Sequence, residues 1–281
     1  MAEQLSPLGR FERLLLATDG SEFSTSAERL SLDLAERWGA RLWVVSVVLT
    51  NPQVEVVAPG AVEAAEEESR AILARLREEA VKRGVAVETV TRRGPDPHVE
   101  IAAVADEQRA DAIVMARRGK RGLLRRMLGD ATTRVVGAAR CAVLMVPEGA
   151  EGWRRRILLA TDGSRFADAA AVSAARIAAL DRLPVTVVSI VRESFTAERA
   201  AQADEAATRI AGHLAERGLE VDRMVLRGDP GKLIPETAAA READLIVMGT
   251  HGRTGWERVV VGSVTESVMN ASTVPVMAVK L

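Results

Sequence analysis

The chain has 281 residues, 48% apolar and 27% charged, and its 38 basic and 39 acidic side chains give a formal net charge of −1. This balance argues against nucleic acid as a partner, because nucleic-acid sites are strongly basic. A single cysteine excludes an intramolecular disulfide, and no apolar run reaches the roughly 18 residues of a membrane-spanning helix. Length and composition therefore predict a soluble, cytoplasmic protein of two domains with no membrane partner.

Short apolar runs rich in β-branched residues alternate with helical patterns along the chain. In the first half we predict strands at residues 14–17, 42–48, 86–90, 112–115 and 142–146, with helices around 27–38 and 69–80. In the second half we predict strands at residues 157–160, 185–191, 221–226, 245–248 and 276–279, with a helix around 203–214. Continuously apolar strands are typical of a parallel sheet covered on both faces. The alternation predicts a doubly wound α/β domain used twice.

Two sequence blocks occur once in each half. Residues 13–21 read RLLLATDGS, and residues 156–164 read RILLATDGS, with eight identities in nine positions. A second block, ADAIVM, returns as ADLIVM. A repeat of this length indicates a duplicated domain and not a solenoid unit. We therefore expect one domain at residues 1–147 and another at residues 153–281, joined by a short linker.

A glycine-rich segment follows the fourth predicted strand of the second half. Gly249 and Gly252 come directly after the strand, and Gly262 and Ser263 open a helix further along the chain. In a doubly wound sheet, ligands bind beyond the carboxyl ends of the strands, and the amides at a helix start attract anions. This spacing favours a phosphate site, although a tight turn with Ser263 as a helix N-cap explains the same residues.

The spacing Gly249-x2-Gly252-x9-Gly262-Ser263 resembles the nucleotide motif of the ATP-binding branch of the universal stress protein family. The Ala-Thr-Asp-Gly-Ser segment after each first strand is similar to the same family, and the similarity covers nearly the whole chain, once per half. The resemblance implies a tandem protein in which each half has a five-stranded parallel sheet of strand order 3-2-1-4-5. It also implies ATP bound between strands 1 and 4, with or without magnesium.

The resemblance assigns candidate roles to nine residues of the second half. It places Asp162 near the base or the ribose and Ile190 against the adenine, although Asp162 could instead cap a turn. It implies a phosphate cradle made of Gly249, Gly252, Arg253, Gly262, Ser263, Val264 and Thr265.

The corresponding loop of the first half differs at two positions. Ala116 replaces Gly249, and Asp130 replaces Ser263. A carboxylate about 4 Å from a phosphate costs roughly 4 kcal/mol at an effective dielectric of about 20, close to a thousandfold in affinity. The basic segment at residues 117–126 could offset this repulsion or recruit another anion, nucleic-acid phosphates included. We expect the first half to be a mainly structural partner, so that ATP binds in the second half alone.

Several enzyme signatures are missing from the sequence. It has no G-x-x-x-x-G-K-[ST] phosphate loop, no G-x-G-x-x-G motif after either first strand and no G-x-S-x-G nucleophile elbow. We therefore expect an ATP-binding stress regulator. The resemblance implies that its two halves pair through their last strands, and a homodimer of the whole chain is a further option. One alternative is a slow ATPase or autokinase, in which Asp162 holds magnesium and Ser263 or Thr265 accepts phosphate. Another is an interaction module that uses the basic segment.

Overall fold

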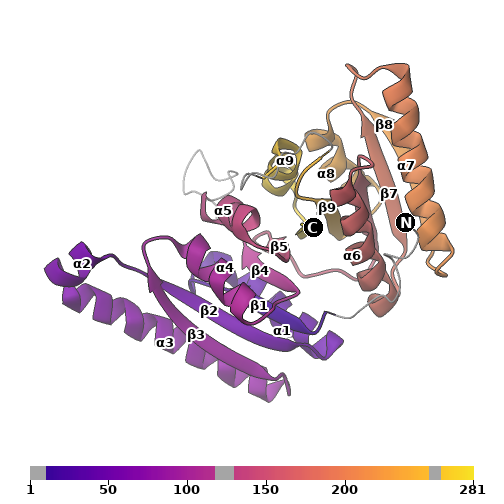
Figure 1. Ribbon diagram of the computed structural model, residues 1–281. Coiled ribbons are helices and arrows are strands. Elements are labelled where there is room, and N and C mark those ends of the chain that lie inside the picture. Colours follow the sequence, from indigo (N-terminus) through magenta and orange to yellow (C-terminus); the bar gives the residue numbers. More distant parts are fainter. Residues whose placement is uncertain (1–10, 118–129, 253–260) are drawn as a thin grey trace. The chain divides into compact units, whose positions relative to one another are not determined.

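The computed structural model describes residues 11–117, 130–252 and 261–281 (Figure 1). Within these ranges the chain forms two compact units, divided between Gly149 and Ala150. Each unit contributes five strands that run parallel, with helices between consecutive strands.

In the first unit the strands lie in the order β3-β2-β1-β4-β5. Their bounds are β1 Arg13–Ala17, β2 Arg41–Leu49, β3 Val87–Gly94, β4 Ala112–Ala116 and β5 Ala142–Val146. The helices are α1 Thr25–Trp38, α2 Pro52–Val57, α3 Pro59–Lys82, α4 Pro97–Glu107 and α5 Asp130–Ala138, and a short 3-10 helix, η2 Glu22–Ser24, precedes α1. The extra residues that lengthen this half form α2 and the start of α3.

The second unit repeats this arrangement with the order β8-β7-β6-β9-β10. Its strands are β6 Ile157–Thr161, β7 Val185–Val191, β8 Val221–Arg227, β9 Leu245–Gly249 and β10 Val276–Val279. Its helices are α6 Arg165–Asp181, α7 Ala197–Ala215, α8 Pro230–Ala240 and α9 Ser263–Ala271. The predicted α/β class and the strand order 3-2-1-4-5 are therefore confirmed in both halves.

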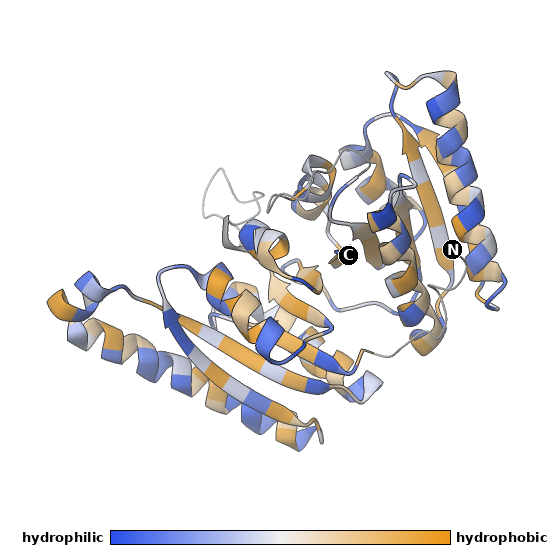
Figure 2. Cartoon of the chain, in the orientation of Figure 1, coloured by the Kyte–Doolittle hydropathy of each residue, from blue (hydrophilic) through white to orange (hydrophobic). Residues whose placement is uncertain are grey.

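The central strands are apolar because helices cover both faces of the sheet. Every residue of β6 and β9 is buried, and Figure 2 shows hydrophobic strands beside helices of mixed hydropathy. Right-handed crossovers place α6 and α7 on one face and α8 and α9 on the other, and the two helices of each face contact each other. The strand order reverses between β6 and β9, so a crevice opens at their carboxyl ends. In the part of the chain that the structure describes, no helix is long and apolar enough to cross a membrane.

In each unit, the aspartate of the ADAIVM or ADLIVM block accepts hydrogen bonds from the backbone that leads into the first strand. The carboxylate of Asp244 accepts hydrogen bonds from the backbone amides of residues 154–156 at 2.7, 2.9 and 3.0 Å. The carboxylate of Asp111 does the same for Glu12 and Arg13, both at 2.8 Å. This part of the repeat therefore has a structural role.

Candidate functional site

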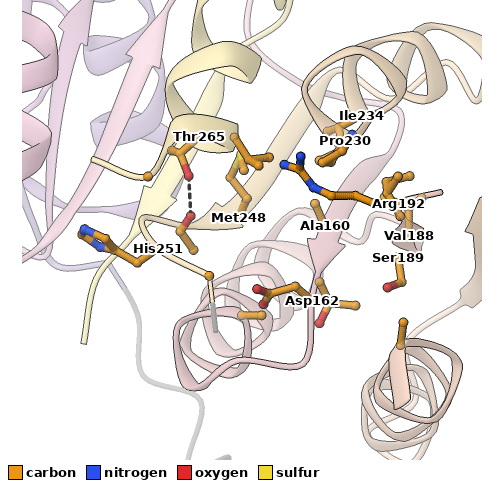
Figure 3. A pocket seen from close by; sticks show the side chains of 18 of the residues that line it. Ala160, Asp162, Val188, Ser189, Arg192, Pro230, Ile234, Met248, His251 and Thr265 are labelled. Atoms are coloured by element: carbon orange, nitrogen blue, oxygen red, sulfur yellow. Dashed lines mark hydrogen bonds between the residues drawn. The ribbon is translucent and has the colours of Figure 1, made fainter. Parts of the chain in front are cut away.

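A cavity of about 270 Å³ lies at the carboxyl ends of β6, β7 and β9 in the second unit (Figure 3). Eight of the nine residues named from the sequence line it: Asp162, Ile190, Gly249, Gly252, Gly262, Ser263, Val264 and Thr265. The ninth, Arg253, lies outside the described residues. The structure thus brings together residues that lie up to 103 positions apart in the chain.

One wall of the cavity is apolar. Ala160 pairs with Val188 in the β6–β7 register, so their side chains share the sheet face covered by α8. Met248 follows on β9, and Pro230 and Ile234 of α8 complete the wall (Figure 3). Met248 is 5% exposed and lines the cavity as well as the core. An apolar wall of this kind suits a flat ring system.

Another side of the cavity is formed by the start of α9. Gly262 is the N-cap residue of α9, with no side-chain cap, so the alternative that made Ser263 the N-cap is wrong. The first backbone amide of α9 with an acceptor inside the helix is that of Glu266. It donates a hydrogen bond to the carbonyl oxygen of Gly262 at 3.0 Å. The amides of Ser263, Val264 and Thr265 therefore have no acceptor within the helix. They form a donor group at the positive end of the helix dipole.

A side chain at any of the three described glycines of the loop would crowd the protein's own atoms. A Cβ on Gly249 would lie 2.7 Å from the Cβ of Phe166, and one on Gly252 would lie 2.6 Å from Asp162 Oδ2. A Cβ on Gly262 would lie 3.0 Å from the carbonyl oxygen of Thr250. The sequence argument had explained these glycines by the approach of a phosphate, and the structure adds this second reason.

Thr265 ties the loop to the strand. Its hydroxyl donates to the carbonyl oxygen of Gly249 at 2.9 Å and lies 3.3 Å from that of Thr250. In the first unit the hydroxyl of Thr132 donates to the carbonyl oxygen of Ala116 at 3.4 Å. This hydrogen bond from a threonine hydroxyl to the end of the preceding strand, which we call the threonine clamp, occurs in both units. The side chain of Thr265 therefore has a structural role that does not depend on a ligand.

Asp162 both caps a turn and faces the cavity. Its Oδ1 accepts from the amide of Ser164 at 3.0 Å, as the turn-capping alternative expected, while Oδ2 lies beside Gly252. The hydroxyl of Ser164 is used elsewhere, because it caps α6 by accepting from the amide of Ala167 at 3.2 Å.

The matching aspartate of the first unit accepts hydrogen bonds from two hydroxyl groups. Oδ1 of Asp19 accepts from the hydroxyl of Ser21 at 2.6 Å and from that of Ser24 at 2.7 Å, in addition to the amide of Ser21 at 3.1 Å. Ala167 stands in the second unit where Ser24 stands in the first. The two units therefore present this carboxylate differently.

The loop after β7 and the first turn of α7 contribute lining residues that the sequence argument missed. Arg192, Phe195 and Arg199 line the cavity, and the guanidinium of Arg199 lies 4.2 Å from the centre of the Phe195 ring. Figure 3 shows Arg192 reaching across the cavity toward Pro230. The available signal was their position directly after the second strand, at the same sheet edge as Ile190. They add two exposed cations to the rim of a site whose lining carries one carboxylate, that of Asp162.

His251 also lines the cavity, at its glycine-rich end. Its ring is tilted against that of Phe166, with 5.3 Å between the ring centres, and its Nδ1 lies 3.1 Å from the Thr250 hydroxyl. Among the described residues there is no group of three or more His, Cys, Asp or Glu side chains that could hold a metal ion.

The first unit differs at the corresponding loop, as the sequence indicates. Ala116 ends β4, and Asp130 is the first residue of α5. The side chain of Asp130 and the basic residues 118–126 lie outside the described part of the chain. Their effect on an anion therefore stays a prediction.

The comparisons with known proteins agree with this architecture. The sequence model of the universal stress protein family matches residues 10–147 and again residues 154–280. Universal stress protein MJ0531 of Methanocaldococcus jannaschii is 33% identical over 140 residues, covering 48% of this chain and 82% of that protein. Universal stress protein Rv2005c of Mycobacterium tuberculosis is 28% identical over 237 residues, covering 76% and 78%.

A solved structure extends the likeness to the whole chain. A universal stress protein from Archaeoglobus fulgidus has a TM-score of 0.77 at 22% identity, covering 96% of this chain and 97% of that one, which supports the fold. With two matches to the family model, the chain belongs to the universal stress protein family and carries two copies of its domain.

Proposed function

We propose that the second unit binds one ATP and that the protein is a cytoplasmic, nucleotide-dependent regulator of the stress response. The observation that carries this proposal is the pairing of two features in one cavity. The amides of Ser263, Val264 and Thr265 have no acceptor within the helix, and the apolar wall that includes Pro230 and Ile234 lines the same cavity. A triphosphate suits the first feature and a purine the second.

Other residues of the site suit the base, the ribose and the phosphates of a nucleotide. Ile190 and Met248 would contact the base, and Asp162, which lies beside Gly252, would face the ribose. Arg253 would add a contact to the phosphates, and the cations at the rim favour an anionic ligand. Magnesium would be held chiefly by phosphate oxygens, because the described side chains form no metal cluster.

Binding would act on the protein through mass action. ATP at about 100 times its Kd stabilises the binding unit by about 2.7 kcal/mol. That free energy is enough to change the population of a partner-binding state. Pairing of the two halves and formation of a homodimer stay predictions.

A charge swap between the two units tests the location of the site. We expect Ser263→Asp to lower the affinity for ATP by roughly a thousandfold, because it puts a carboxylate beside the phosphates. The reverse substitution in the first unit, Asp130→Ser, is the matched control and should leave the affinity of the original site unchanged. Titration calorimetry on the full chain measures both. Unchanged ATP binding in Ser263→Asp would contradict the proposal.

A further inference from the structure

The cavity extends to a second lobe on the other side of the sheet edge. Thr161 pairs with Ser189 in the β6–β7 register, one position after the pair that forms the apolar wall. Because side chains alternate along a strand, these two hydroxyl residues face α6 and α7, away from α8. Ala167 of α6 and Ala203 of α7 line the cavity on this side. The lobe therefore joins the base-sized wall to a pocket with polar side chains.

The first unit fills the equivalent space with larger side chains. There Glu28 accepts from the Thr18 hydroxyl at 2.6 Å and pairs with Arg75 at 2.8 Å. Ile72 lies over Gly20, where an added Cβ would come within 2.2 Å of its Cδ1. The first unit has Ser24, Glu28, Ser69 and Ile72 where the second has Ala167, Ala171, Ala203 and Ala206. All four changes remove side-chain volume, so the second unit keeps this space open.

Ser189 places an unused hydroxyl in that lobe. The residue is 1% exposed, it lines the cavity, and within the described ranges its Oγ has no hydrogen-bond partner. Figure 3 shows the hydroxyl on the same side of the cavity as Asp162. A buried hydroxyl without a partner lowers stability, and such a group at a cavity wall is typical of a position that a ligand completes.

We propose that Ser189 binds a ribose hydroxyl of the nucleotide and makes the site selective for ribonucleotides. This inference rests on the proposed function. The base lies against the apolar wall and the phosphates at the start of α9, so the sugar lies over the carboxyl ends of β6 and β7, where the two lobes of the cavity meet. In ATP the sugar carries the only free hydroxyls, and a hydroxyl both donates to and accepts from the Ser189 Oγ. Specificity follows because a deoxy analogue would leave the Ser189 hydroxyl buried without a partner.

The test compares ATP with 2′-deoxy-ATP and 3′-deoxy-ATP by titration calorimetry on the full chain. In the unsubstituted protein, one deoxy analogue should bind roughly tenfold more weakly than ATP, the value of one lost hydrogen bond. In Ser189→Ala, the affinity for ATP should fall to the affinity for that analogue. The ratio of the two affinities should then be about one. Ser46→Ala removes the same atom at the matching position of β2, and it should keep the full preference for ATP.

Thermal unfolding without nucleotide separates binding from folding. Ser189→Ala should leave the midpoint unchanged or raise it, because it removes a buried group that has no partner. Equal affinity of the unsubstituted protein for ATP and both analogues would overturn the role of Ser189 while leaving ATP binding intact. So would a preference that survives in Ser189→Ala. If none of the three nucleotides binds the unsubstituted protein, the proposed function itself fails.

Discussion

The backbone of Gly249 lies directly against Phe166, so that a Cβ on the glycine would stand 2.7 Å from the phenylalanine Cβ and 2.8 Å from its carbonyl carbon. This contact joins the end of β9 to the first turn of α6. In the first unit the helix starts later, because η2 precedes α1, and Phe23 is only half-buried. That different entry into the helix accommodates Ala116 at the position of Gly249.

We expect Gly249→Ala to lower the free energy of unfolding by roughly 1–3 kcal/mol, because the added methyl group overlaps backbone atoms that cannot easily move. Chemical denaturation without nucleotide measures the change. Ala116→Gly is the matched control, and it should cost less than about 1 kcal/mol. If Gly249→Ala lost ATP binding at unchanged stability, the glycine would serve the ligand and not the packing.

The Asp244 carboxylate accepts three backbone amides, and Asp111 accepts two. We expect Asp244→Ala to lower the free energy of unfolding by about 2–4 kcal/mol, because the amides lose a charged acceptor in a largely buried place. The loss for Asp111→Ala should be smaller, since its amides are exposed to water. Urea denaturation of both variants gives the comparison, and an equal loss would contradict the ranking by burial.

The Thr265 clamp should be worth about 1 kcal/mol, the usual net contribution of one buried hydrogen bond. Thr265→Val should lose this amount, and Thr265→Ser, which keeps the hydroxyl, should lose less. Thr132→Val tests the same clamp in the first unit. Free energies of unfolding are the measurement, and full stability of both valine variants would show that the hydroxyls are not needed.

Burial raises the pKa of the Cys141 thiol to about 12 from its ordinary value of 9.0. The thiol therefore stays protonated and should react slowly with maleimide at neutral pH, whereas the urea-unfolded chain should react fully. The sign of the pH effect follows from linkage. The folded thiol keeps its proton where the unfolded one loses it, so this group's contribution is complete below pH 9.0 and is lost as the pH rises toward 12. Fast labelling of the folded protein would contradict the burial of this group.

The fold was largely predictable because its signals are local. The central strands are continuous apolar runs between turn residues, whereas β3 and β8 mix apolar and charged residues. The duplicated blocks mark the same strands twice. The glycine spacing likewise identified a segment that lines the cavity. Most predicted strand ends lie within one residue of the observed ones, as is usual at element boundaries. The exception is β3, which continues four residues past its predicted end at residue 90, to Gly94.

The parts of the site that escaped prediction depend on contacts between distant segments. Ser189 is indistinguishable from any other residue of a buried strand until α7 is known to present Ala203 opposite it. The contact of Phe166 with Gly249 joins segments from opposite ends of the domain. Arg192 lies in a loop whose course no periodicity specifies, and Arg199 lies in the first turn of the helix that follows this loop. Tertiary packing decides all three cases.

The most direct test of the central claim is native mass spectrometry of the full chain with added ATP. The account predicts one bound nucleotide per chain for the unsubstituted protein and for Asp130→Ser, and none for Ser263→Asp at the same ATP concentration. Two nucleotides per chain, or one that persists in Ser263→Asp, would contradict it.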